Sequence, residues 1–125
     1  MKKMSPNLFV ESVPETVAFY TDLGFQLVLS VPEDAPTQWA MMTKGEVSFM
    51  FQSFKGIGEE LPEIPRIKGG ALLFYIDVNN ILDFRRNLPP NVQVIKDLEK
   101  TFYGATEFSI LDNNGFVLTF AEDIA

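Results

Sequence analysis

The chain of 125 residues contains no cysteine and no histidine. Without cysteine, disulfides, thiolate nucleophiles and thiolate metal sites are all excluded. Without histidine, the chain lacks the commonest general base near neutral pH and the commonest ligand for zinc, iron, nickel or copper. We therefore expect no metal cofactor, although Asp and Glu side chains leave a hard cation such as magnesium open, against which the lack of a clustered carboxylate motif argues. Any acid–base chemistry would need carboxylates or tyrosines.

Long apolar runs are also missing. No run approaches the roughly 20 residues needed to cross a bilayer, and Met1-Lys2-Lys3 is not followed by the apolar segment of a signal peptide. A cytoplasmic location is expected. Seventeen acidic against ten basic residues give a net charge of −7, which repels nucleic-acid phosphate and anionic lipid. We expect neither nucleic acid nor a membrane as partner, although such charge also simply keeps surfaces soluble.

What the chain does contain is enough apolar material for one core. It is 46% hydrophobic with twelve phenylalanines, and is most simply one domain. Its two halves match at an offset of 65 positions, and each matched stretch has the pattern of a strand, a turn and an amphipathic helix. The matched pairs are Leu8/Leu73, Phe9/Phe74, Val13/Val78, Val17/Leu82, Phe19/Phe84 and Leu23/Leu88. A duplicated βα unit would place a pseudo-symmetric site between its copies.

The pattern predicts an α+β fold with two tandem βαβββ modules, at about 1–54 and 70–125, and a linker at about 55–69. In the first module we expect strands at 7–11, 25–30, 38–42 and 46–52 and a helix at 14–23. In the second we expect strands at 71–77, 92–96, 107–111 and 116–121 and a helix at 80–88. Val17, Phe19, Tyr20 and Leu23 should form the buried stripe of the first helix.

Two loops superficially look like ligand loops. Gly56-Ile57-Gly58 lacks the preceding strand and the following helix of a phosphate loop. Asp112-Asn113-Asn114-Gly115 lacks the downstream glutamate of a calcium loop and is predicted to be a plain hairpin turn. Neither is expected to bind a ligand.

Three stretches resemble a known family, the vicinal oxygen chelate superfamily, which contains glyoxalase I, extradiol dioxygenases and the fosfomycin- and bleomycin-resistance proteins. The stretch from Phe19 to Phe25 (FYTDLGF) looks like its helix end. Trp39–Met42, Gly45 and Phe49–Gln52 resemble a hairpin of the bleomycin-resistance-like branch. Tyr103–Phe116 is similar to that branch's C-terminal signature, with Asn113 replacing the usual proline.

The resemblance implies two βαβββ modules that form a curled, U-shaped mixed sheet with an open cleft, in a homodimer that completes the site. In metal-using relatives, four strand positions carry the ligands. Here those positions hold Ser5 or Asn7, Phe49 or Met50, Leu73, and Thr119. None is a competent metal ligand, so the resemblance implies ligand binding without chemical conversion.

Strand alternation selects the residues that would line the cleft. Around Thr119 it places Val117, Thr119 and Ala121 on one face and Phe116, Leu118 and Phe120 on the other, which suits packing against a helix. The candidate ligand-binding residues are Phe9, Trp39, Met41, Met50, Leu73, Tyr75, Phe102, Tyr103, Glu107 and Thr119. Their aromatic rings suit a planar, mostly apolar ligand, although each aromatic could instead belong to the core.

Glu107 is the acidic candidate, on the same alternating face as Ser109. Its carboxylate could receive a cationic ligand group, or it could be structural and bonded to backbone amides or to Lys100. Glu59, Glu60 and Glu63 in the linker are either a solvated loop or an acidic rim.

Three functions follow from these features. The first is a metal-free binding protein that sequesters a small, partly aromatic molecule, either cationic or neutral, in a dimer cleft, of which antibiotic sequestration is one instance. The second is an enzyme of the same superfamily, a lyase or isomerase, with Glu107 as base or Tyr103 as acid. The third is an interaction module whose cleft is filled by Phe102, Leu73 and Met50.

Overall fold

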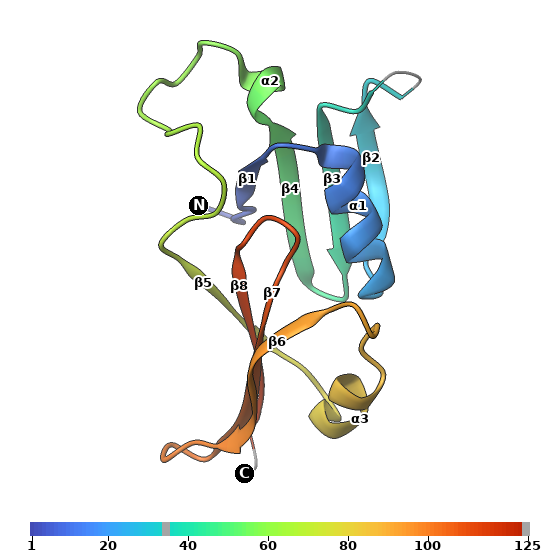
Figure 1. The fold of residues 1–125 in the computed structure, drawn as a ribbon, viewed down its shortest axis with the longest axis vertical. Helices are drawn as coiled ribbons and strands as arrows, with labels where there is room; N and C mark the ends of the chain where they lie inside the picture. Colours follow the sequence, from blue (N-terminus) through green and yellow to red (C-terminus); the bar gives the residue numbers. More distant parts are fainter. Residues whose placement is uncertain (34–35, 124–125) are drawn as a thin grey trace. The chain divides into compact units, whose positions relative to one another are not determined.

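The computed structural model describes residues 1–33 and 36–123 and divides the chain into two compact units, Met1–Gly69 and Gly70–Ala125. Each unit carries one four-stranded mixed sheet (Figure 1). Each follows the order strand, helix, strand, strand, strand, with one further short helix in the first unit. The predicted α+β class and the duplicated βαβββ topology are therefore confirmed.

The first unit contains β1 (Asn7–Val10), α1 (Val13–Asp22), β2 (Gln26–Val31), β3 (Trp39–Lys44), β4 (Val47–Ser53) and α2 (Phe54–Ile57). Its sheet has the order β1-β4-β3-β2, with β1 parallel to β4 and the other pairs antiparallel. The Ser12 hydroxyl caps α1 by accepting a hydrogen bond from the Glu15 backbone N–H at 3.2 Å. Gly24, with a φ of +103°, follows the helix in a conformation that favours glycine.

The core of the first unit forms where α1 lies against one face of this sheet (Figure 1). Tyr20 is fully buried there, and its ring contacts those of Phe25, Phe49 and Phe51. The predicted helix stripe is partly wrong. Tyr20 and Leu23 are buried as expected, but Val13 and Thr16 complete the buried side, while Val17 and Phe19 are only half-buried.

The second unit contains β5 (Leu73–Asp77), α3 (Ile81–Arg86), β6 (Gln93–Lys100), β7 (Ala105–Leu111) and β8 (Val117–Asp123). Its sheet order, β5-β8-β7-β6, with β5 parallel to β8, repeats that of the first unit. The Asp112 carboxylate closes the β7–β8 hairpin by accepting hydrogen bonds from the backbone N–H groups of Asn114 and Phe116, both at 2.8 Å. The predicted hairpin turn between these strands is confirmed.

Helix α3 packs against the phenylalanine face of the second sheet. The Phe84 ring lies 4.6 Å from Phe120 and 6.0 Å from Phe108, measured between ring centroids. Leu118 shares this face and is fully buried. The predicted alternation along β8 is therefore confirmed, and the opposite face of the sheet carries Thr119.

The residue-by-residue repeat predicted from the sequence is wrong by one position on the first strand of each unit. Leu8 pairs with Phe51 and is 6% exposed, whereas its sequence match Leu73 pairs with Val117 and is 52% exposed. Successive strand residues point to opposite faces, so a shift of one residue reverses the side. The structural counterpart of Leu8 is Phe74, which contacts Phe116 on the buried side.

The segment predicted to be a linker has internal structure. It begins with the four-residue helix α2, and the Ser53 hydroxyl accepts a hydrogen bond from the Gly56 backbone N–H at 2.8 Å. Further along, the guanidinium of Arg66 donates to the backbone carbonyls of Gly58, Glu60, Leu61 and Ile64. One side chain thus ties together much of the segment that carries Glu59, Glu60 and Glu63. Within the described ranges, no helix has the length and apolar character to cross a membrane.

Candidate functional site

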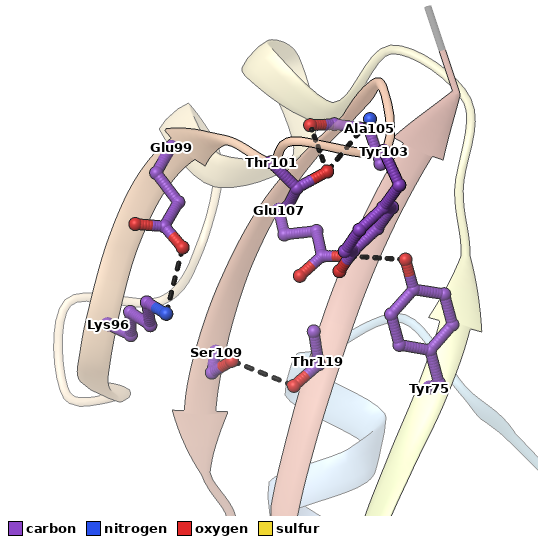
Figure 2. Close-up of polar contacts among 9 residues, drawn as sticks. All are labelled: Tyr75, Lys96, Glu99, Thr101, Tyr103, Ala105, Glu107, Ser109 and Thr119. Atoms are coloured by element: carbon purple, nitrogen blue, oxygen red, sulfur yellow. Dashed lines mark hydrogen bonds and ion pairs between the residues drawn. The ribbon is translucent and has the colours of Figure 1, made fainter.

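The second sheet presents a polar face on the side opposite α3 (Figure 2). The strand register aligns Tyr75 on β5 with Thr119 on β8, Thr119 with Ser109 on β7, and Ser109 with Lys96 on β6. Directly paired residues share one face of a sheet. The predicted candidates Leu73, Tyr75, Glu107 and Thr119 are thus brought to one side of this module.

Glu107 is the centre of the polar face. One oxygen of its carboxylate, Oε2, accepts hydrogen bonds from two phenols, those of Tyr75 and Tyr103 (Figure 2). Tyr75 comes from β5, and Tyr103 from the turn that precedes β7. From the sequence, the expected structural partners of Glu107 are backbone amides or Lys100. The structure gives it two tyrosines instead.

The carboxylate changes the acidity of both phenols. The hydrogen bond to Glu107 is the main cause that raises the pKa of Tyr75 above its usual range, with desolvation and the nearby negative charge adding to it. The same hydrogen bond is the first cause of the raised pKa of Tyr103. A phenolate beside a carboxylate would lose the hydrogen bond and meet a like charge. Both tyrosines therefore remain protonated hydrogen-bond donors at neutral pH.

The turn that carries Tyr103 is closed by its own hydrogen bonds. The Thr101 backbone N–H donates to the Ala105 carbonyl at 2.8 Å, and the Ala105 N–H donates to the Thr101 hydroxyl at 3.0 Å. Gly104 adopts a φ of +88°, a conformation that favours glycine. Phe102 at the tip is fully exposed, and its ring meets that of Tyr103 edge-on at 5.0 Å.

A cation lies beside this face but already has a partner. The Lys96 ammonium is 2.8 Å from the carboxylate of Glu99, and this contact is the first cause of the raised pKa of Lys96. Glu99 is directly paired with Glu107 across β6 and β7. The surroundings of Glu107 are therefore acidic, with the local lysine committed to Glu99 (Figure 2).

The centre of the sheet holds a buried pair of hydroxyls. The Ser109 and Thr119 side-chain oxygens lie 2.8 Å apart, and both residues are buried. Either hydroxyl can be the donor. The Thr119 hydroxyl is thus engaged in a buried hydrogen bond, at one of the four positions that the sequence resemblance assigned to metal ligands.

The first unit brings together the other four predicted candidates. On the face opposite α1, Phe9 pairs with Gln52, Gln52 with Trp39, and Met41 with Met50. Phe9, Trp39, Met41 and Met50 are all partly exposed. Phe49 points to the other side, into the aromatic cluster around Tyr20. Met50, and not Phe49, therefore lies on the face opposite α1, together with Phe9, Trp39 and Met41.

The candidate metal positions do not suit a metal ion. Asn7 donates its amide N–H to the Gln52 side-chain oxygen at 2.9 Å, Met50 and Leu73 are apolar, and Thr119 is bonded to Ser109. Across residues 1–33 and 36–123, no group of three or more His, Cys, Asp or Glu side chains is arranged to hold a metal. These residues offer no set of hard or nitrogen ligands.

Several polar residues of these faces were not among the predicted candidates. Gln52 separates Phe9 from Trp39, and Lys96 and Glu99 flank Glu107. The alternation of Ser48, Met50 and Gln52 along β4 is a sequence signal that could have identified Gln52. No comparable signal exists on β6, because its register shifts between Val94 and Lys96 and again between Lys96 and Glu99.

Comparison with known proteins gives one family. Residues 5–120 match the Glyoxalase/Bleomycin resistance protein/Dioxygenase superfamily. No curated protein sequence matches the chain.

Several solved structures share the fold. TioX from Micromonospora sp. ML1 is 16% identical, with a TM-score of 0.80 over 99% of this chain and 100% of its own. A bleomycin resistance determinant encoded on the transposon Tn5 is 19% identical, with a TM-score of 0.68 over the whole of both chains. A bleomycin-binding protein complexed with bleomycin is 20% identical, with a TM-score of 0.66 over 98% of this chain and 99% of its own. At these identities the similarity establishes the fold.

Proposed function

This chain belongs to the Glyoxalase/Bleomycin resistance protein/Dioxygenase superfamily, and from that premise we propose that it binds and sequesters a small, partly aromatic molecule without a metal and without converting it. The observation that carries the proposal is the pair of open sheet faces. Each lies opposite the helix of its unit and displays partly exposed aromatic side chains beside a polar anchor, Gln52 in one and Glu107 in the other.

Aromatic and thioether side chains offer broad apolar contact, and a few polar groups orient the ligand. Trp39 and Met41 offer such contact on the first sheet, and Tyr75 and Tyr103 offer it on the second. A structural neighbour described as a bleomycin-binding protein complexed with bleomycin is consistent with a small-molecule ligand. The homodimer, the shared cleft and the cytoplasmic location predicted from the sequence remain parts of this proposal.

The binding reading fits the site better than catalysis does. Catalysis would need Tyr103 as an acid or Glu107 as a base. The pKa of Tyr103 is raised by its hydrogen bond to Glu107, and one oxygen of the Glu107 carboxylate already accepts hydrogen bonds from two phenols. The interaction-module reading expects Phe102 to be packed against Leu73, yet Phe102 is fully exposed and Leu73 is 52% exposed. Sequestration is therefore the function that these side chains support best.

Thermal unfolding in the presence of ligands tests the proposal. We would measure the midpoint of the purified protein with bleomycin, with other aromatic amines and with divalent metals, each with and without a chelator. A ligand at a hundredfold excess over its Kd stabilises the folded state by about 2.7 kcal/mol. A rise with an aromatic compound that is insensitive to chelator supports sequestration. A midpoint that falls on chelation would overturn the metal-free proposal.

The part of Trp39 in ligand binding is tested by comparing two variants with the wild type. Trp39→Leu should reduce the ligand-induced rise in midpoint, because a flat aromatic surface is lost from the open face. Phe19→Leu is the matched control, since Phe19 lies on α1, which packs against the opposite face of the same sheet. Equal ligand responses of both variants and the wild type would remove Trp39 from the site.

A further inference from the structure

We propose that the ligand carries a protonated amine and that Oε1 of Glu107 accepts a hydrogen bond from its N–H group. This inference rests on the proposed function and deepens it by naming the chemical class recognised on the second sheet. The two oxygens of the Glu107 carboxylate have different surroundings.

Oε2 already accepts the hydrogen bonds of Tyr75 and Tyr103, whereas Oε1 has no hydrogen-bond partner in the described part of the chain. The two phenols hold the carboxylate from β5 and from the turn before β7, so its position is defined before any ligand arrives. An ionised carboxylate is a strong acceptor with room for about four hydrogen bonds. Oε1 is therefore a hydrogen-bond acceptor whose position and direction are fixed.

The negative charge of Glu107 is not neutralised by an ion pair with any described residue. Lys96, the nearby cation, is held by Glu99 at 2.8 Å. Glu99 itself lies directly across from Glu107. The local field consequently favours a cation and disfavours carboxylate or phosphate ligands, in keeping with the net charge of −7.

The rings beside the carboxylate add to this preference. Tyr75 is 51% and Tyr103 55% exposed, so part of each ring is accessible to a ligand. Aromatic faces attract cations through their quadrupole, and they also provide flat contact for an apolar group attached to the amine. The combination of a carboxylate with two aromatic rings matches an amine on an aromatic skeleton.

The free oxygen also discriminates among cations. A guanidinium is bound best by two parallel acceptors, but Oε2 is occupied by the phenols. A quaternary ammonium has no N–H to donate. A primary or secondary ammonium needs only one acceptor for its directed hydrogen bond, which is what Oε1 provides.

Three probes with the same aromatic part separate these contributions: naphthylmethylamine, trimethyl(naphthylmethyl)ammonium and naphthylmethanol. We would titrate each into the purified protein and follow backbone amide resonances by NMR. Both the amine and the alcohol can donate a hydrogen bond to Oε1, but only the amine adds an attraction between opposite charges. Since an exposed ion pair contributes up to about 1 kcal/mol, the amine should bind up to about fivefold more tightly than the alcohol. It should also bind more tightly than the quaternary compound.

Glu107→Gln should abolish the preference for the amine and leave the affinity for naphthylmethanol unchanged. Asp77→Asn is the matched control. Asp77 lies on the same strand as Tyr75. Asp77 and Glu107 are both paired with Ala121, so the Asp77→Asn substitution removes an equal charge from the same face of the sheet. This control should retain the preference for the amine. Amide spectra of the variants establish that each is folded.

Each outcome decides between the two proposals. Equal affinities of the wild type for amine and alcohol would overturn the amine inference while leaving sequestration intact. Equal affinities for amine and quaternary compound would overturn the directed hydrogen bond to Oε1. A preference that survives in Glu107→Gln would place the amine elsewhere. Binding of none of the three probes would count against sequestration itself as well as against the inference.

Discussion

Glu122 on β8 caps the helix that begins at Ile81, 41 residues earlier in the chain. Its carboxylate accepts hydrogen bonds from the backbone N–H groups of Ile81 at 3.1 Å and Asn80 at 2.8 Å. The side chain of Asn80 makes no capping hydrogen bond, and its φ is +54°. A side chain of β8 therefore accepts the hydrogen bonds of the first backbone N–H groups of α3. Its negative charge also lies at the positive end of the helix dipole.

Glu122→Ala should lower the free energy of unfolding by about 1 kcal/mol, the usual contribution of a helix cap. The two N–H groups at the start of α3 would lose their acceptor. Asp123→Ala is the control, because it removes the next carboxylate along β8 from an exposed position. Urea denaturation measures both variants. Equal losses in the two would show that charge alone, and not capping, is responsible.

The tyrosines beside Glu107 should titrate at higher pH than they do in Glu107→Gln. The folded protein raises the pKa of Tyr75 and Tyr103 through their hydrogen bonds to the carboxylate, and the neutral amide of glutamine removes the like charge. Phenolate absorbance during an alkaline titration measures the shift, with Tyr20 common to both proteins. Superimposable titration curves would show that the phenols do not donate to Glu107 in solution.

The same shift determines how stability changes with alkaline pH. A tyrosine in the unfolded chain has a pKa of about 10, and the folded values lie above it. The two phenols therefore contribute stability that is complete below about pH 10 and is lost as the pH rises through the folded pKa values. The free energy of unfolding of the wild type should fall more steeply with rising pH in this range than that of the double variant Tyr75→Phe/Tyr103→Phe.

The fold could be predicted because its signals are local. Ser12, Pro14 and Gly24 mark the ends of α1 in the sequence itself, and apolar alternation marks the strands. Alternation around Thr119 also predicted correctly which side of β8 faces the helix. The offset of 65 residues failed on the first strand of each unit because successive strand residues point to opposite faces of the sheet. An error of one residue therefore assigns every side chain to the wrong face.

The partners in the site could not be predicted to the same extent. Tyr75 and Glu107 lie 32 residues apart, and their hydrogen bond depends on the order of strands in the sheet. Arg66 and Glu122 act through backbone groups, which leave no trace in side-chain patterns. The sequence thus shows whether a site residue is aromatic or charged. Only the folded chain shows which atom that residue contacts.

The buried hydroxyl pair of Ser109 and Thr119 should behave as one unit. Thr119→Val leaves the Ser109 hydroxyl buried without its partner, so we expect a loss of about 1–3 kcal/mol in the free energy of unfolding. The double variant Ser109→Ala/Thr119→Val removes both polar groups and should lose less than the sum of the two single variants. Urea denaturation of all four proteins measures this coupling. Strictly additive losses would show that the 2.8 Å contact contributes no coupling.

Arg66 should determine the local stability of residues 58–66. Its guanidinium donates to four backbone carbonyls, including those of Gly58 at 2.8 Å and Leu61 at 2.8 Å. Lysine carries the same charge but presents a single ammonium in place of the planar fork. Arg66→Lys should therefore speed amide hydrogen exchange and proteolytic cleavage in this segment. Lys68→Ala is the control, since Lys68 is exposed at the end of the same segment.

The unfolding of the rest of the chain should change little in Arg66→Lys, because the hydrogen bonds of Arg66 are confined to residues 58–64. Local opening and global unfolding are separable when a segment makes few buried apolar contacts. Exchange rates in β3 and β4 should thus match those of the wild type. Unchanged exchange across residues 58–66 in Arg66→Lys would mean that the segment is held by other contacts, such as the helix α2 at its start, and that Arg66 only fills a position that the backbone has already adopted.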